Sequence, residues 1–190
     1  MQQKLLSSVN DIILAASQLK NPLALSFMED AANMIADCFQ NGNKVIIAGN
    51  GGSLCDASHF AEELTGFFRG PRKALPAISL SEPGHITCVA NDFGFEWIFA
   101  RGVEAYGNEG DIFIALTTSG NSPNLIKAVE VATFKKLKTI AFLGKGGGLL
   151  KGQTDLEFII EDFKTSDRIQ EVHMAAMHVI IELIEHRLFS

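Results

Sequence analysis

The chain has 190 residues, of which 47% are hydrophobic and 20% are charged, a balance typical of a globular rather than a disordered protein. A core of this size needs no disulfide or structural metal to fold. Sixteen basic and twenty-two acidic residues give a formal net charge of −6, which argues against duplex nucleic-acid binding, because that function requires clustered Lys and Arg. We therefore predict no nucleic-acid partner, while a small anionic substrate stays possible.

Residues 1–41 are predicted to be helical, with a break at Asn21-Pro22. Apolar residues recur at a spacing of three or four on both sides of this break: Leu5, Val9, Ile12, Ile13 and Ala16, then Leu25, Met28, Ala32, Ile35 and Phe39. Asp11 interrupts the first apolar stretch, which lacks a basic leading region and a clear cleavage site. This segment therefore favours an amphipathic helix over a signal peptide.

From residue 45 onward, short apolar runs alternate with helical stretches. The predicted strands cover Val45–Ala48, Ala77–Leu80, Ile112–Leu116, Thr139–Leu143 and Leu156–Ile160, and the predicted helices cover 54–67, 95–106, 123–136 and 166–188. Buried strands separated by helices are typical of a parallel sheet with helices on both faces. We predict an α/β fold, a three-layer αβα sandwich around a five-stranded, mostly parallel sheet, with additional N-terminal helices.

The cysteines and the hydropathy pattern predict a cytoplasmic location. Cys38, Cys55 and Cys88 are odd in number and form no CxxC pair, which indicates buried free thiols in a reducing compartment. No apolar run approaches the ~20 residues that span a bilayer, so no membrane partner is expected.

Two loops that follow predicted strands are candidate ligand sites, because ligands of doubly wound sheets bind beyond the carboxyl ends of the strands. The first is Gly49-Asn50-Gly51-Gly52-Ser53, whose glycines let backbone amides approach an anion at a helix N-terminus; a tight turn without a ligand is equally compatible. It does not match GxGxxG, which disfavours nicotinamide binding.

The second loop runs from Thr117 to Pro123 and carries four hydroxyl side chains before a helix. Capping explains Ser122 and Pro123 but not the other three hydroxyls, and we predict a phosphate monoester site here. Residues 144–148 (GKGGG) are either a flexible turn, which we favour, or a second phosphate loop.

Two helices carry side chains able to act in catalysis. His59 and Glu63 lie four residues apart on one helical face, where a surface pair of no consequence is the commoner arrangement. In the last helix, Gln170 and His178 lie eight residues apart and roughly on one side, although either is also compatible with helix packing.

Taken together, five segments resemble the sugar isomerase (SIS) domain family and, within it, the bacterial phosphoheptose isomerases. They cover nearly the whole chain in the family's order: GNGGSLCDASHFAEELTG (49–66), LPAISL (75–80), CVANDFGFEWIF (88–99), TTSGNSPNLIKAV (117–129) and DRIQEVHMAAMHVIIELIE (167–185). The resemblance implies an aldose–ketose isomerase that converts sedoheptulose 7-phosphate to D-glycero-D-manno-heptose 7-phosphate, the first step towards ADP-heptose for the lipopolysaccharide core.

The resemblance also implies a site. It makes Glu63 and His178 the catalytic acid/base pair and assigns one zinc ion per subunit to His59, Glu63, Gln170 and His178. The implied substrate-binding residues are Asn50, Gly51, Gly52, Glu63, Asn91, Asp92, Thr117, Thr118, Ser119, Ser122, Asp167 and Gln170. Family members often carry a cation at the position of Phe67, and Arg69 or Arg72 are candidates to replace it.

The resemblance further implies a homotetramer of single SIS domains spanning 1–190, with residues 1–41 as a helical extension used in oligomerisation. Three alternatives stay open. One is an adaptor that binds the replication initiator, although the adaptor lacks the Glu and the last His that are present here. The others are a regulatory phosphosugar-binding domain, for which no DNA-binding extension is present, and an isomerase of another ketose phosphate.

Overall fold

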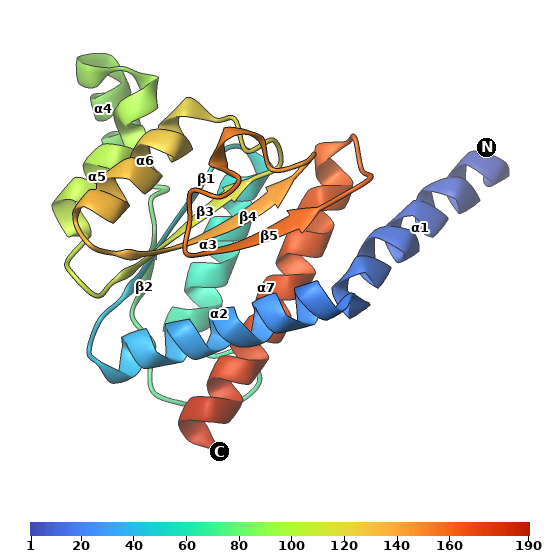
Figure 1. The fold of residues 1–190 in the computed structure, drawn as a ribbon, viewed down its shortest axis with the longest axis horizontal. Helices are drawn as coiled ribbons and strands as arrows, with labels where there is room; N and C mark the ends of the chain where they lie inside the picture. The colour runs from blue at the N-terminus through green and yellow to red at the C-terminus, as the bar shows by residue number, and fades with distance from the viewer.

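The five apolar runs form one sheet in the computed structural model, which describes residues 1–190 (Figure 1). The strand order is β2-β1-β3-β4-β5, and all neighbouring strands are parallel. The strands are β1 (Val45–Gly49), β2 (Ala77–Ser79), β3 (Ile112–Thr117), β4 (Lys138–Gly144) and β5 (Leu156–Ile160). Both β1 and β3 are buried along their whole length, which explains their continuous apolar sequences.

Helices cover both faces of the sheet, so the predicted αβα sandwich is confirmed (Figure 1). They are α1 (Gln2–Ser17), α2 (Pro22–Gln40), α3 (Gly52–Thr65), α4 (Pro83–Phe93), α5 (Ile98–Tyr106), α6 (Pro123–Phe134) and α7 (Ser166–Phe189), with 3₁₀ turns at Gln18–Lys20, Phe95–Trp97 and Gly148–Leu150. Alternate strand residues face opposite layers: Val45 and Ile47 pack with α2, α3 and α7, whereas Ile46 and Ala48 pack with α4, α5 and α6.

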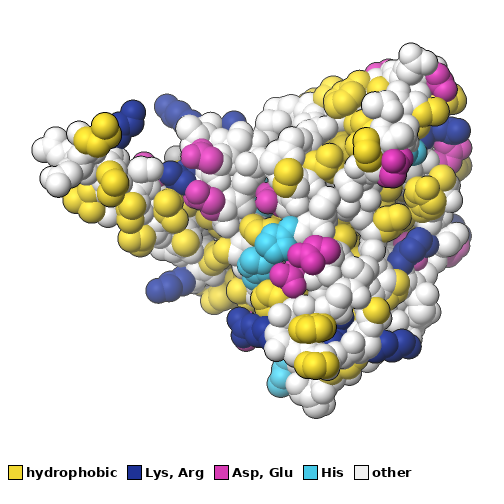
Figure 2. All heavy atoms as spheres, turned by 180° about the vertical axis from the view of Figure 1, so that it is seen from behind, with side chains coloured by type: hydrophobic (Ala, Val, Ile, Leu, Met, Phe, Trp, Pro, Cys, Tyr) yellow, Lys and Arg dark blue, Asp and Glu magenta, His cyan; other side chains and the backbone are white.

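The N-terminal helices differ in how they join the body. Whereas α2 packs a buried apolar face into the core, α1 projects away from the body and buries only Ala15 (Figure 1). Leu5, Leu6 and Ile13 on α1 are each at least 60% exposed, and Figure 2 shows this row of apolar side chains along the projecting helix. None of the helices combines the length and hydropathy needed to cross a bilayer.

Two expectations about local structure were wrong. Helix α4 is absent from the predicted helices. Pro83 occupies its first turn, and the Glu82 carboxylate accepts the Gly84 and His85 N–H groups at 2.9 and 2.6 Å. The three thiols are free as expected, but only Cys38 is buried, whereas Cys55 and Cys88 are exposed.

Candidate active site

The two predicted ligand loops lie side by side at the carboxyl ends of β1 and β3. Strands β1 and β3 are parallel neighbours, and Gly49 at the end of β1 pairs in register with Leu116. The chain order reverses at this point in the sheet, which is where doubly wound folds bind their ligands. Beyond the strands, the Asn50 and Asn124 side chains each donate a hydrogen bond to the other at 2.9 Å.

The β1 loop needs its glycines to turn sharply into α3. Gly51 has φ +57°, and a Cβ on Gly49 would lie 2.5 Å from the Ser53 carbonyl oxygen. Both Gly51 and Gly52 are exposed, so the first amides of α3 are accessible to an anion. The Gln170 side chain packs against Gly52 and donates to the Ser53 hydroxyl at 3.3 Å.

In the β3 loop, part of the hydroxyl set shapes the backbone. The buried Thr117 hydroxyl accepts the Gly120 N–H at 3.2 Å, and the Ser119 hydroxyl accepts the Asn121 N–H at 3.2 Å. Ser122 occupies the N-cap position of α6 but makes no capping hydrogen bond; its hydroxyl lies 3.4 Å from that of Thr117. The local hydrogen bonds leave these oxygens with further capacity to bind a ligand.

The glycine-rich segment 144–148 supports the β3 loop from behind. A Cβ at Gly120 would overlap the Gly147 carbonyl oxygen, so the two backbones are in contact. The Leu150 N–H donates to the Gly120 carbonyl at 3.1 Å, and the Leu149 N–H donates to the Asn121 side chain at 3.0 Å. These contacts give the segment a structural part in shaping the hydroxyl-rich loop.

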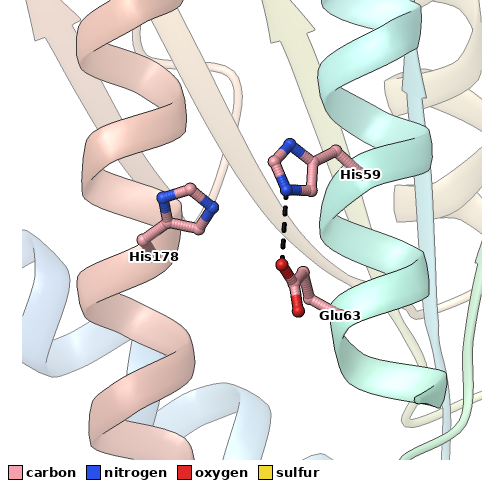
Figure 3. A group of neighbouring side chains, drawn as sticks. All are labelled: His59, Glu63 and His178. Carbon is pink, nitrogen blue, oxygen red and sulfur yellow. Dashed lines mark ion pairs between the residues drawn. The ribbon is translucent and has the colours of Figure 1, made fainter. Parts of the chain in front are cut away.

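His59, Glu63 and His178 point toward one another across the space between α3 and α7 (Figure 3). His59 Nε2 lies 3.3 Å from Glu63 Oε1, and one ligand atom from each of the three residues lies within 4.8 Å of the others. The His178 ring stacks on Phe68 at 5.4 Å between centroids. Histidine and acidic side chains are grouped on this face of the molecule in Figure 2.

Electrostatics keeps His178 neutral over a wider pH range than a free histidine. Burial lowers the pKa of His178, and neighbouring His59 and Arg69 lower it further, whereas Glu63 opposes the shift. Its Nε2 atom is buried and has no hydrogen-bond partner. A neutral imidazole whose buried ring nitrogen has no hydrogen-bond partner is suited to bind a metal ion through that nitrogen.

The cluster of His59, Glu63 and His178 has the ligand types and spacing of a metal site. Two imidazoles and one carboxylate are a donor set that zinc accepts, and three protein ligands leave a position open for substrate in catalytic zinc sites. The lone pair of the partnerless His178 Nε2 gains a partner when a cation binds. The Gln170 side chain reaches the first turn of α3 rather than this cluster, so its part as a zinc ligand stays a prediction.

Arg72 anchors the end of the helix that carries His59 and Glu63. Its Nε donates to Glu185 of α7 at 2.7 Å, and its other nitrogens donate to four backbone carbonyls, those of Glu63, Leu64, Gly66 and Lys73. Because the last carbonyls of a helix lack internal partners, the guanidinium caps α3 while joining it to α7. Phe67 is exposed, and Arg69 pairs with Glu182 at the surface.

Other expected site residues lie outside this cluster. Asp167 is exposed in the first turn of α7, where a hydrogen bond from the Thr165 hydroxyl, with smaller contributions from Arg168, lowers its pKa. Ser166 beside it lies 3.0 Å from the Thr118 hydroxyl. Asn91 and Asp92 are exposed on α4, in the helical layer opposite α3 and α7. Their assignment to the substrate pocket stays a prediction.

Two residues near the site were missed. Asn124 is 1% exposed and pairs with Asn50, a partner 74 residues away that no local pattern indicates. Asp56 lies one turn before His59; burial raises its pKa, His59 lowers it, and its Oδ2 is buried without a partner. The spacing of Asp56, three residues before His59, was a signal available in the sequence.

Comparison with known proteins gives concordant results. The family model described as "SIS domain" matches residues 10–144. The phosphoheptose isomerase of Fusobacterium nucleatum is 62% identical over 161 residues, which cover 85% of this chain and 82% of that protein. The phosphoheptose isomerase of Vibrio cholerae is 53% identical over 158 residues, which cover 83% of each chain.

A solved structure extends the similarity to the whole fold. The phosphoheptose isomerase of Francisella tularensis superposes with a TM-score of 0.91 at 36% identity, covering 97% of this chain and 98% of the other. This match includes the helices that carry the three clustered side chains.

Proposed function

Since the chain belongs to the SIS-domain family and, within it, to the phosphoheptose isomerases, we propose that it interconverts sedoheptulose 7-phosphate and D-glycero-D-manno-heptose 7-phosphate. It is an aldose–ketose isomerase, and this reaction begins heptose synthesis for the lipopolysaccharide core. The main observation in support of this proposal is that Glu63 and His178 face each other across the space between α3 and α7.

The substrate lies along α3 and α7 in this proposal. Thr118 and Ser166 are in contact at the amino end of α7, Gln170 faces Ser53, and His178 faces His59 and Glu63, so the two helices run side by side in the same direction. Gly52 and His59 are seven residues apart, or ~10 Å along the helix axis. An extended seven-carbon sugar phosphate spans a comparable length.

The phosphate group binds at the hydroxyls of Thr117, Thr118, Ser119 and Ser122. Side-chain hydroxyls and the N-termini of α3 and α6 supply hydrogen bonds and a favourable dipole without a fixed cation. Asn50, Gly51 and Gly52 bind the middle of the chain together with Gln170. Fixing the phosphate end orients the reacting carbons at the far end of the groove.

The chemistry is a proton transfer between adjacent carbons. An enediol intermediate forms when one group removes the proton from C1 or C2, and the ketose and aldose interconvert when a proton returns to the neighbouring carbon. Glu63 and His178 face each other at a spacing that lets one act as base and the other as acid. The lowered pKa of His178 keeps its imidazole able to accept a proton near neutral pH.

Zinc is the metal we propose for His59, Glu63 and His178, with one ion per subunit. When bound, it supplies stabilisation of negative charge that develops on the substrate oxygens. His59 makes no other polar contact than Glu63, which supports a ligand role.

Glu63→Gln tests the assignment, because it preserves shape and removes the base. We expect turnover of sedoheptulose 7-phosphate to fall by at least ~10²-fold, with substrate affinity largely retained. Glu62→Gln is the matched control, since Glu62 is the exposed neighbour on the same helix. Near-normal turnover in Glu63→Gln would remove the acid/base assignment. Fructose 6-phosphate and arabinose 5-phosphate as competitors test the choice of sugar.

We also propose a cytoplasmic homotetramer in which α1 packs against other subunits. The support is the exposed apolar side of α1, which its own subunit leaves uncovered. Residues 1–190 then form one SIS domain, with residues 1–41 as its helical extension used in oligomerisation; within this extension, α2 also packs into the core of its own subunit. An adaptor role is not favoured, since Glu63 and His178 are both present and face each other.

A further inference from the structure

The two loops that hold the substrate in the proposed function are joined by one pair of side chains. Asn50 Nδ2 donates to Asn124 Oδ1, and Asn124 Nδ2 donates to Asn50 Oδ1, both at 2.9 Å. This closed amide pair links the loop after β1 to the first turn of α6. Asn124 is 1% exposed, so it has no surface of its own to offer a ligand.

The pair uses only part of the hydrogen-bonding capacity of Asn50. A carboxamide has two N–H donors and two acceptor lone pairs, and the pair occupies one of each. Asn50 is half-buried, and its side chain makes no other hydrogen bond, so its second N–H and second lone pair have no partner within the protein. Its orientation is fixed by Asn124, because rotating one amide alone would set donor against donor and acceptor against acceptor.

We propose that Asn124 is a positioning residue for the isomerisation. It touches no reacting atom; it orients the Asn50 carboxamide toward the sugar chain and holds the β1 loop in register with the phosphate-binding loop. The inference rests on the proposed function, in which the substrate contacts both loops at once. Rigid relative placement of such contacts matters because small displacements of bound groups slow a reaction strongly.

The structure supplies a matched control at the opposite end of the same two strands. Asn43 precedes β1, and its Nδ2 donates to the Glu109 carbonyl and the Asp111 carboxylate, both at 3.2 Å and both just before β3. Asn43→Ala and Asn124→Ala therefore each remove a side-chain link between β1 and β3. Only Asn124→Ala removes it beside the proposed substrate.

The experiment compares kcat, KM, inhibition by inorganic phosphate and melting temperature for these two variants. We expect both to melt at a lower temperature, but only Asn124→Ala to lose kcat, by about tenfold. Inhibition by phosphate should change by less than about threefold in both, because the hydroxyl side chains of the β3 loop that bind free phosphate are intact in both variants. Asn124→Asp keeps an acceptor for Asn50, so its kcat should lie between those of the wild type and Asn124→Ala. This variant replaces Asn124→Ala in the experiment if the Ala variant does not fold.

Several outcomes would overturn the inference. One is an unchanged kcat in Asn124→Ala, and another is a loss of phosphate binding as large as the loss of kcat, which would mean that the β3 loop itself had collapsed. Losses that simply add in the Asn50→Ala/Asn124→Ala double variant would also contradict it, because partners in one pair should not be additive. Absence of turnover in the wild-type protein would instead overturn the proposed function, and this inference with it.

Discussion

Replacing Arg72 should destabilise the protein more than replacing Arg69 or Glu185. The guanidinium side chain is 4% exposed and makes five hydrogen bonds, one to Glu185 and four to backbone carbonyls around the end of α3. Arg72→Leu keeps the apolar stem but removes all five. It leaves the Glu185 carboxylate, itself 16% exposed, with only the Phe68 N–H as a donor.

The loss of stability in Arg72→Leu follows from the Glu185 carboxylate that it leaves without its charged partner. Removing one partner of a buried ion pair costs about 3–5 kcal/mol, because the remaining charge stays desolvated. Against a total stability of about 5–15 kcal/mol, this loss is a large fraction of the free energy of unfolding. Arg72→Lys retains the charge opposite Glu185 yet cannot reproduce the planar set of donors, so we expect a loss of about 1–3 kcal/mol.

Urea unfolding followed by circular dichroism at fixed protein concentration measures both variants. Glu185→Gln, alone and combined with Arg72→Leu, isolates the contribution of the pair, and coupling between them should reach at least ~1 kcal/mol. Arg69→Leu is the control, since Arg69 pairs with Glu182 at the surface. If Arg72→Leu cost no more than Arg69→Leu, the guanidinium would not be the clamp between α3 and α7 described above.

Two further predictions concern α7 and α1. Burial lowers the pKa of His173 to about 4, so the unfolded chain binds its proton more readily and stability falls as pH drops from about 6.5 toward 4, by about 3 kcal/mol in total. His173→Gln, which keeps a donor for the Leu143 carbonyl, should remove that part of the pH dependence of unfolding, whereas the exposed His186→Gln should not. Deleting residues 1–16 should convert the proposed tetramer to smaller species in sedimentation. The far-UV spectrum should stay helical, because α1 buries only Ala15 in its own subunit. A tetramer of the truncated chain would contradict the proposed role of α1.

Local sequence patterns predicted most of the fold. Each apolar run became a strand. For β1, β3 and β4 the reason is nearly continuous burial on both faces of a parallel sheet, which leaves little choice of residue type. Helix α4 was missed; it begins at Pro83, a residue suited to the first turn of a helix, and the Glu82 carboxylate caps it. The spacing of apolar residues along the chain therefore predicts an element where its burial follows a regular pattern.

The site was predictable to the extent that its residues lie on one helix. The spacing of His59 and Glu63 placed them on one face, but nothing local indicates that His178 comes within reach of both. Asn124 was missed for the same reason, because its partner lies 74 residues away in the chain, in the loop after the neighbouring strand. Motif resemblance supplied the pairing of α3 with α7 that periodicity alone does not contain.

The side chain of Gln18 bears on how the protein avoids aggregation through its sheet edge. Strand β5 is the last in the sheet, and an unpaired strand edge is a template on which another chain can add. Just past its end, Gln18 Nε2 donates to the Glu161 carbonyl at 2.9 Å and Gln18 Oε1 accepts the Glu161 N–H at 3.2 Å, so one side chain occupies both backbone groups as a neighbouring strand would. The turn between α1 and α2 thus covers the backbone next to the open edge at this point, where another chain could otherwise add as a strand.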